Sequence, residues 1–273
     1  MILGLEWQLV AELLLLGCCT GFLAGLLGIG GGMLTVPFVT LILSHRGVQA
    51  DLAVKMAIAT SMSTILFTSL SSVRAHHSRG AVRWDLVRGL APGIVIGGLL
   101  AGAGLFALIK GSWLAIIFAL FVGFSATRML RNAKPSHARQ MPGAAGQTLA
   151  GGVIGLVSGL VGAGGAFVSV PFMTGRNVAI HNAVATSAAL GFPIAVANTA
   201  GYAIAGRALA PALPGAFGYL YLPALGALAL ASVLLAPLGA RAAHAMDVSQ
   251  LKRVFAALLY GLAGYMLFKA AAP

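Results

Sequence analysis

The sequence predicts an all-α polytopic membrane protein made of two inverted repeats, each a glycine-broken helical hairpin followed by three transmembrane helices. Composition predicts the class, because the chain is 59% hydrophobic and only 8% charged over 273 residues, whereas soluble domains carry about 25% charged residues. Stretches without any Asp, Glu, Lys, Arg or His, such as 140–175 and 208–240, are long enough to span a bilayer core of about 30 Å. An internal repeat predicts how the helices are arranged.

One glycine motif occurs twice. Its first copy, residues 20–39, reads TGFLAGLLGIGGGMLTVPFV, and its second copy, residues 154–173, reads IGLVSGLVGAGGAFVSVPFM. Nine positions are identical at a constant offset of 134 residues. A glycine cluster followed by a proline within an apolar segment, once in each half, is typical of two-fold transporters with broken helices.

The two segments that contain this motif are too long to cross a membrane once. Residues 13–44 form an apolar stretch of 32 residues, which as one helix is about 48 Å long, well beyond a core of about 30 Å. The second such stretch is 145–174. Glycine clusters interrupt both, at 28–32 and 162–165, and glycine permits backbone angles closed to other residues. Each stretch is therefore predicted to form two shorter helices joined by a glycine turn.

The remaining apolar segments predict six single spans, three after each hairpin. These spans are 53–73, 89–109, 112–130, 180–205, 215–240 and 250–270. The predicted organisation is an N-terminal repeat at 1–130, a cytoplasmic linker at 131–144 and a C-terminal repeat at 145–273, within one integral-membrane domain. An odd number of spans per repeat inverts the second repeat relative to the first.

The distribution of basic residues supports hairpins over single crossings. If each broken segment returns to its side of entry, twelve of the 17 lysines and arginines share one face. The five on the other face are Arg46, Lys55, Lys110, Arg207 and Lys269. If each broken segment crosses once, the division falls to ten and seven. Because basic residues concentrate on the cytoplasmic side, we expect hairpins, with both termini on the periplasmic side.

The glycine turns are candidate anion sites. A turn followed by a helix leaves unpaired backbone N–H groups at the helix start, and together with the helix dipole these favour an anion. Inverted halves would bring both helix starts to one central site. The predicted substrate contacts at the turns are Gly30, Gly31, Gly32, Gly164, Gly165 and Ala166. The alternative is that the glycines only permit tight helix packing.

Hydroxyl and amide side chains form a second candidate set. Thr60 and Ser61 align with Thr186 and Ser187 in the second repeat, and Asn198 follows on the same predicted helix. Such groups donate hydrogen bonds to an oxyanion without imposing a fixed charge. We expect all five to contact the substrate. The alternative is that the hydroxyls bond back to carbonyls of their own helices.

Charged groups within predicted spans are few. Lys55, which aligns with His181, could attract anions or extend to the interface, and His181 could titrate near neutral pH or lie at the interface. Both are candidates for an electrostatic or coupling role. Of the five acidic residues only Glu12 falls within an apolar segment. Since cation pumps and proton relays use buried carboxylates, cation transport is disfavoured.

The sequence shows no set of catalytic residues. Residues 155–159, GLVSG, lack the spacing of a serine nucleophile elbow, and no HExxH motif or dinucleotide fingerprint is present. We therefore expect no enzyme activity, no cofactor and no metal. The net charge of +12 reflects loop residues that set topology, so the expected partners are the lipid bilayer and a small anion rather than nucleic acid. A homodimer is left open.

At these motifs the chain resembles the TauE/SafE family of sulfite-exporter-like membrane proteins. The resemblance rests on GFLAGLLGIGGGMLTVPF, its second copy GLVSGLVGAGGAFVSVPF, and the Ala-Thr-Ser triplets at 59–61 and 185–187. It extends over essentially the whole chain. It implies a multi-pass protein of the bacterial inner membrane that moves sulfite, sulfonates or related organosulfur anions. One departure is Ala166, which stands where the first copy has Gly32, so the two turns need not contribute equally.

We therefore expect a secondary transporter, a permease or exporter, for small sulfur oxyanions such as sulfite or organosulfonates. Alternating access would arise from rocking of the inverted repeats. An anion-selective channel using the same residues is one alternative. A membrane-embedded enzyme or an accessory subunit is another, and it predicts product formation or dependence on a partner.

Overall fold

The chain is almost entirely helical in its computed structural model, which describes residues 7–27, 32–131, 140–209, 211–243 and 248–271. The elements are α1 (Trp7–Leu27), α2 (Gly32–His45), α3 (Ala50–His77), α4 (Trp84–Leu99), the π-helix η1 (Leu100–Leu105), α5 (Phe106–Leu108), α6 (Gly111–Leu130), α7 (Ala144–Val161), α8 (Ala166–Thr174), α9 (Ile180–Gly206), β1 (Ala216–Phe217), β2 (Leu220–Tyr221), α10 (Leu222–Ala243) and α11 (Val248–Ala271).

Six helices in the described ranges are long and apolar enough to cross a membrane. They are α3, the continuous run Trp84–Leu108, α6, α7, α9 and the Arg253–Ala271 part of α11. Shorter apolar stretches lie in α1, α2 and α10. Large apolar side chains such as Leu149 and Phe268 are exposed, while polar ones such as Thr60 and Asn198 are fully buried. This reverses the arrangement of a soluble protein and confirms an all-α, multi-pass membrane protein.

Both overlong segments are broken where the glycine clusters stand. α1 ends at Leu27 and α2 begins at Gly32, and the intervening residues 28–31 lie outside the described ranges. α7 ends at Val161 and α8 begins at Ala166. In the second turn Gly162 and Gly165 have φ angles of 72° and 76°, a region that strongly favours glycine. The predicted break in the second segment is confirmed, and the one in the first segment falls on residues outside the described ranges, between α1 and α2.

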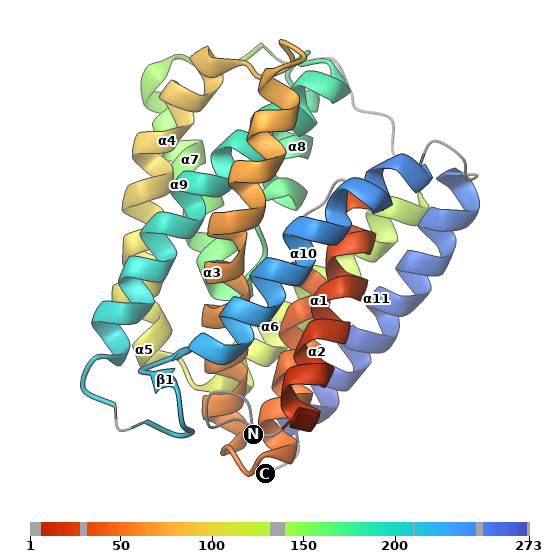
Figure 1. Cartoon of the computed structure of the whole chain (residues 1–273). Coiled ribbons are helices and arrows are strands. Elements are labelled where there is room, and N and C mark those ends of the chain that lie inside the picture. The colour runs from red at the N-terminus through yellow and green to blue at the C-terminus, as the bar shows by residue number, and fades with distance from the viewer. Residues whose placement is uncertain (1–6, 28–31, 132–139, 210, 244–247, 272–273) are drawn as a thin grey trace.

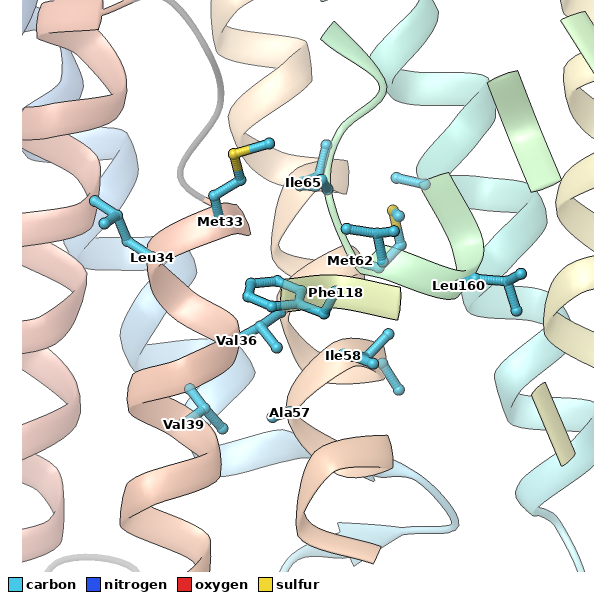
Figure 2. Close-up of a cluster of buried hydrophobic side chains, with 14 of the residues drawn as sticks. Met33, Leu34, Val36, Val39, Ala57, Ile58, Met62, Ile65, Phe118 and Leu160 are labelled. Atoms are coloured by element: carbon cyan, nitrogen blue, oxygen red, sulfur yellow. The ribbon is translucent and has the colours of Figure 1, made fainter. Parts of the chain in front are cut away.

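The two hairpins enter from opposite ends of the molecule. α1 begins, and α3 begins after α2, at the lower end of Figure 1. In Figure 2, α2 descends from Met33 to Val39 beside α3, which ascends from Ala57 to Ile65. The α7–α8 hairpin instead opens at the upper end, where α9 begins (Figure 1). These directions support the predicted inversion, although equivalence of the halves under a two-fold axis stays a prediction.

The first helix of each hairpin packs mainly against a helix of the other half. α1 packs along α10, and α7, its counterpart in the second half, packs along α4. The counterparts α3 and α9 also pack together, as do α6 and α11 (Figure 1). Each half therefore buries its hairpin against the other half, which joins the two into one integral-membrane body.

Repeated glycines make these exchanged contacts close. A Cβ atom added at Gly21 on α1 would lie 2.4 Å from Ser232 Cα on α10. At Gly155, the matching position of α7, it would lie 2.3 Å from the Ile94 carbonyl oxygen on α4. Small residues let helix backbones approach closely within membranes. The identity of Gly21 and Gly155 in the motif thus reflects helix packing at equivalent contacts.

Two features differ from the expectation. α10 begins at Leu222 rather than near 215, because Gly215 and Gly218, with φ angles of 83° and 55°, turn the chain into the antiparallel pair β1–β2. α4 also continues into the π-helix η1, which packs against α9. There an added Cβ at Gly102 would lie 2.8 Å from the Asn198 carbonyl oxygen.

Candidate functional site

The two hairpins touch where α2 begins and α7 ends. A Cβ added at Gly32 would lie 2.5 Å from the Gly162 carbonyl oxygen and 3.3 Å from Ala163 Cα. The Ser61 hydroxyl of α3 lies between them, 3.4 Å from the Gly32 carbonyl oxygen and 3.5 Å from that of Gly162. We call Gly32, Ser61, Gly162 and Ala163 the turn junction. It brings together two of the predicted site residues, Gly32 and Ser61, with the second glycine turn.

The start of α8 offers free backbone donors beside this junction. The Gly165 N–H donates to the Ala163 carbonyl at 2.7 Å. Within the described residues, the N–H groups of Gly164, Ala166 and Phe167 find no acceptor. Three unpaired N–H groups at a helix start favour an anion. The corresponding Gly30 and Gly31 of the first turn lie outside the described residues.

Apolar side chains cover the second turn. A Cβ at Gly164 would lie 3.3 Å from Ile65 Cδ1, and one at Gly165 would lie 2.4 Å from Ile194 Cδ1. Figure 2 shows Ile65 and Met62 of α3 beside the turn, within a buried cluster that includes Phe118 of α6. In this conformation the turn is therefore covered by the side chains of Ile65 from α3 and Ile194 from α9. Neither isoleucine was among the predicted site residues.

Thr60 and Thr186 occupy equivalent places and make equivalent bonds. The Thr60 hydroxyl oxygen accepts a hydrogen bond from the backbone N–H of Tyr221 at 3.0 Å, directly before α10. The Thr186 oxygen accepts one from the N–H of Arg83, also at 3.0 Å, directly before α4. Each threonine thus holds the start of a helix from the other half. Their predicted contact with a substrate stays a prediction.

Replacing either threonine by valine is expected to lower the melting temperature of the purified protein. Valine at position 60 leaves the buried N–H of Tyr221 unpaired, which costs about 1–3 kcal/mol. Valine at position 186 leaves the partly buried N–H of Arg83 unpaired, and the effect there should be smaller. Thr60→Ser and Thr186→Ser keep the acceptor and should melt close to the wild type. Equal melting temperatures for the valine and serine variants would contradict this structural role. A change in anion affinity beyond the change in stability would show that the hydroxyl also contacts the substrate.

The other predicted polar residues lie along α9. The Ser187 hydroxyl is 2.7 Å from the hydroxyl of Ser169 on α8, which joins the second hairpin to α9. The Asn198 amide donates to the Ile194 carbonyl at 2.8 Å, and its Oδ1 is buried without a partner among the described residues. Ser158 Oγ, in the last turn of α7, is likewise buried and unpaired. Alignment of the repeats gives no signal for Ser158, because its counterpart in the first copy is alanine.

Lys55 and His181 lie at opposite ends of the molecule. Lys55 precedes Ser61 by six residues, or about 9 Å along α3. Its ammonium donates to the Ala107 carbonyl at 3.1 Å and lies 5.6 Å from the centre of the Tyr219 ring. His181 is exposed at the start of α9. Neither of these two contacts of Lys55 involves the turn junction. A role in coupling stays a prediction for Lys55 and for His181.

Metal ligands do not gather in the described part of the chain. No group of three or more His, Cys, Asp or Glu side chains lies close enough there to hold an ion. The donors beside the turn junction are instead the backbone N–H groups of Gly164, Ala166 and Phe167, which find no acceptor among the described residues. This set suits an anion better than a cation.

Comparison with known proteins assigns the family. Residues 13–266 match the family described as Sulfite exporter TauE/SafE. A probable membrane transporter protein of Haemophilus influenzae is 34% identical over 258 residues, which cover 94% of this chain and 97% of the relative. One from Methanocaldococcus jannaschii is 27% identical over 194 residues, covering 68% of this chain and 71% of the relative. No solved structure matches this chain. The chain is therefore a membrane transporter that belongs to the sulfite exporter TauE/SafE family.

Proposed function

We propose that this protein is a secondary transporter, a permease or exporter, for small sulfur oxyanions such as sulfite or organosulfonates. The observation that carries the proposal is the start of α8, where Gly164, Ala166 and Phe167 have unpaired N–H groups within the described residues. These donors lie beside the contact between the two hairpins. Backbone N–H groups at a helix start bind oxyanions through hydrogen bonds and the helix dipole. The description of the matched family supports the sulfur chemistry.

The placement of the acidic side chains favours an anion over a cation. The Asp51 carboxylate accepts a hydrogen bond from the N–H of Ser112 at 2.9 Å, at the lower end of the molecule. Asp85 pairs with Arg83 at 2.6 Å, at the upper end. Glu12 is exposed on α1. These three are the acidic residues in the described part of the chain, so no carboxylate there borders the turn junction.

Alternating access would use the exchanged packing of the two halves. Figure 1 shows one bundle that contains α1, α2, α10 and α11 and another that contains α4, α7, α8 and α9. The hairpins of the two bundles meet at Gly32 and Gly162. Each bundle contains helices of both repeats, so the predicted rocking would take place between these bundles rather than between the repeats, and it would open the junction to each end in turn. We place the protein in the bacterial inner membrane with both termini on the periplasmic side, following the distribution of basic residues.

The function is tested with the purified protein in liposomes. Charge movement and tracer uptake are recorded on rapid addition of sulfite, sulfoacetate, taurine, sulfate or chloride, with and without sodium and pH gradients. A saturable response to sulfite or a sulfonate, with counterflow, is the expected result. Protein-free liposomes and chloride, which contains no sulfur, serve as controls. Single-channel current steps would show that the protein is an anion channel and not a carrier. The absence of both charge movement and tracer uptake for all sulfur anions would overturn the proposal.

A further inference from the structure

A pocket with both polar and apolar lining lies away from the turn junction, between the ends of α2 and α11. It has a volume of about 310 Å³ and is lined by Leu41, Ser44, His45, Tyr265, Phe268 and Lys269. We call it the α2–α11 pocket. His45 is the last residue of α2, and Lys269 lies in the last turn of α11. Both helices end at the lower end of Figure 1, so the pocket is at one membrane interface.

Two hydroxyl groups in the lining of this pocket have no hydrogen-bond partner among the described residues. Ser44 Oγ and Tyr265 OH are both buried and make no hydrogen bond within the described residues. A buried hydroxyl without a partner destabilises a protein by about 1–3 kcal/mol, so two in one pocket call for a ligand that accepts hydrogen bonds. Lys269 and His45 supply positive or protonatable nitrogen at the same place, and the lining contains no acidic residue.

The apolar lining shows from which side a ligand enters. Phe268 is 69% exposed and Leu41 is 38% exposed, as expected for side chains that face lipid tails in a multi-pass protein. The pocket therefore joins an apolar rim to hydroxyl and ammonium donors. A membrane lipid has the same division, because its acyl chains are apolar and its phosphate accepts hydrogen bonds. Basic pockets between transmembrane helices bind lipid headgroups on the cytoplasmic side of membranes, and the same donors can serve at the end of this protein where both termini lie.

We propose that the α2–α11 pocket binds a phosphate oxyanion, supplied by the headgroup of a membrane phospholipid. Lys269 holds the phosphate charge, Ser44 and Tyr265 donate hydrogen bonds to its oxygens, and Leu41 and Phe268 contact the first part of an acyl chain. The site is distinct from the turn junction and needs no transported anion. Because α2 carries Gly32 at its other end, a lipid here would hold the hairpin that forms one side of the junction.

The proposal is tested on the full-length protein, purified and stripped of lipid in detergent. Binding of phosphatidylglycerol is measured by native mass spectrometry and by the shift in melting temperature. Diacylglycerol, which lacks the phosphate, is the matched lipid, and inorganic phosphate is the soluble source. We expect phosphatidylglycerol to bind and to raise the melting temperature, and diacylglycerol to do neither. A shift from inorganic phosphate alone would assign the site to a soluble phosphate and overturn the lipid proposal.

Two variants separate ligand binding from folding. Lys269→Gln and the double variant Ser44→Ala/Tyr265→Phe should each weaken phosphatidylglycerol binding about tenfold, the effect of losing roughly one charge-assisted hydrogen bond. Neither removes a hydrogen bond within the described part of the protein, so melting without lipid should stay at or above the wild-type value. Lys110→Gln, an exposed lysine before α6 at the same end, is the control and should bind normally. Wild-type affinity in both pocket variants, for lipid and for phosphate, would overturn the proposal.

Discussion

Replacing Gly155 by alanine is expected to lower both the melting temperature and the yield of folded protein sharply. The new Cβ would lie 2.3 Å from the Ile94 carbonyl oxygen and 2.9 Å from the Gly98 nitrogen. Both are backbone atoms of α4, so the two helices must separate along their whole contact. Overpacking of this kind costs about 1–3 kcal/mol and occasionally more. Thermal denaturation of the purified protein in one detergent measures the effect.

Gly152 provides the matched control on the same helix. Its added Cβ would find its nearest neighbour, the Gly93 carbonyl oxygen, at 3.7 Å, which is an ordinary contact. Alanine is favoured over glycine in a helix by about 1 kcal/mol, so Gly152→Ala should melt at or above the wild-type temperature. Gly21→Ala should behave like Gly155→Ala if the halves are equivalent. Equal melting temperatures for Gly152→Ala and Gly155→Ala would contradict the close packing of α4 on α7.

Replacing Gly165 by alanine is expected to reduce sulfur-anion transport at least about tenfold in protein that still inserts into liposomes. Its φ of 76° is a left-handed conformation that costs a residue with a Cβ about 1–2 kcal/mol. The new methyl group would also lie 2.4 Å from Ile194 Cδ1. Both effects displace the start of α8, where the N–H groups without an acceptor among the described residues lie. Initial rates of tracer uptake, normalised to inserted protein, measure the loss.

A double variant separates the two causes. Ile194→Val removes Cδ1, so Gly165→Ala/Ile194→Val should recover the steric part of the loss and keep the part due to φ. Gly152→Ala is the control, because its Cβ would find its nearest neighbour at 3.7 Å, the residue has no positive φ, and it lies outside the proposed anion site. Wild-type transport by Gly165→Ala would show that the geometry of this turn is not needed, and the proposed anion site would be wrong.

The hairpins were predictable because a bilayer fixes how long a helix can be. Residues 13–44 exceed that length, and the glycine cluster marks where the helix breaks. The start of α10 was not predictable from hydropathy, because Ala216, Phe217, Leu220 and Tyr221 are as apolar in the β1–β2 turn as in a helix. The π-helix η1 likewise has the composition of a regular transmembrane helix.

Alignment of the two repeats predicted which side chains of the candidate site correspond to each other, but not which groups they contact. Alignment paired Thr60 with Thr186, and the structure gives them matching bonds. Their partners are backbone N–H groups 161 and 103 residues away, which carry no sequence signal. The same holds for the contact of Ser61 with Gly162, at 101 residues. Whether these hydroxyls also touch an anion depends on a ligand, and it stays a prediction.

The exchange of helix partners sets an order for assembly during synthesis. α4 ends at Leu99 and its partner α7 begins at Ala144, whereas α1 ends at Leu27 and its partner α10 begins at Leu222. At a translation rate of about 5–20 residues per second, α7 follows α4 within about 2–9 s, but α10 follows α1 only after about 10–40 s. Of these two exchanged pairs, α4 with α7 can therefore form well before α1 with α10. Until α10 has been synthesised, which is when nearly the whole protein has been made, Gly17 and Gly21 of α1 cannot make their contacts with it.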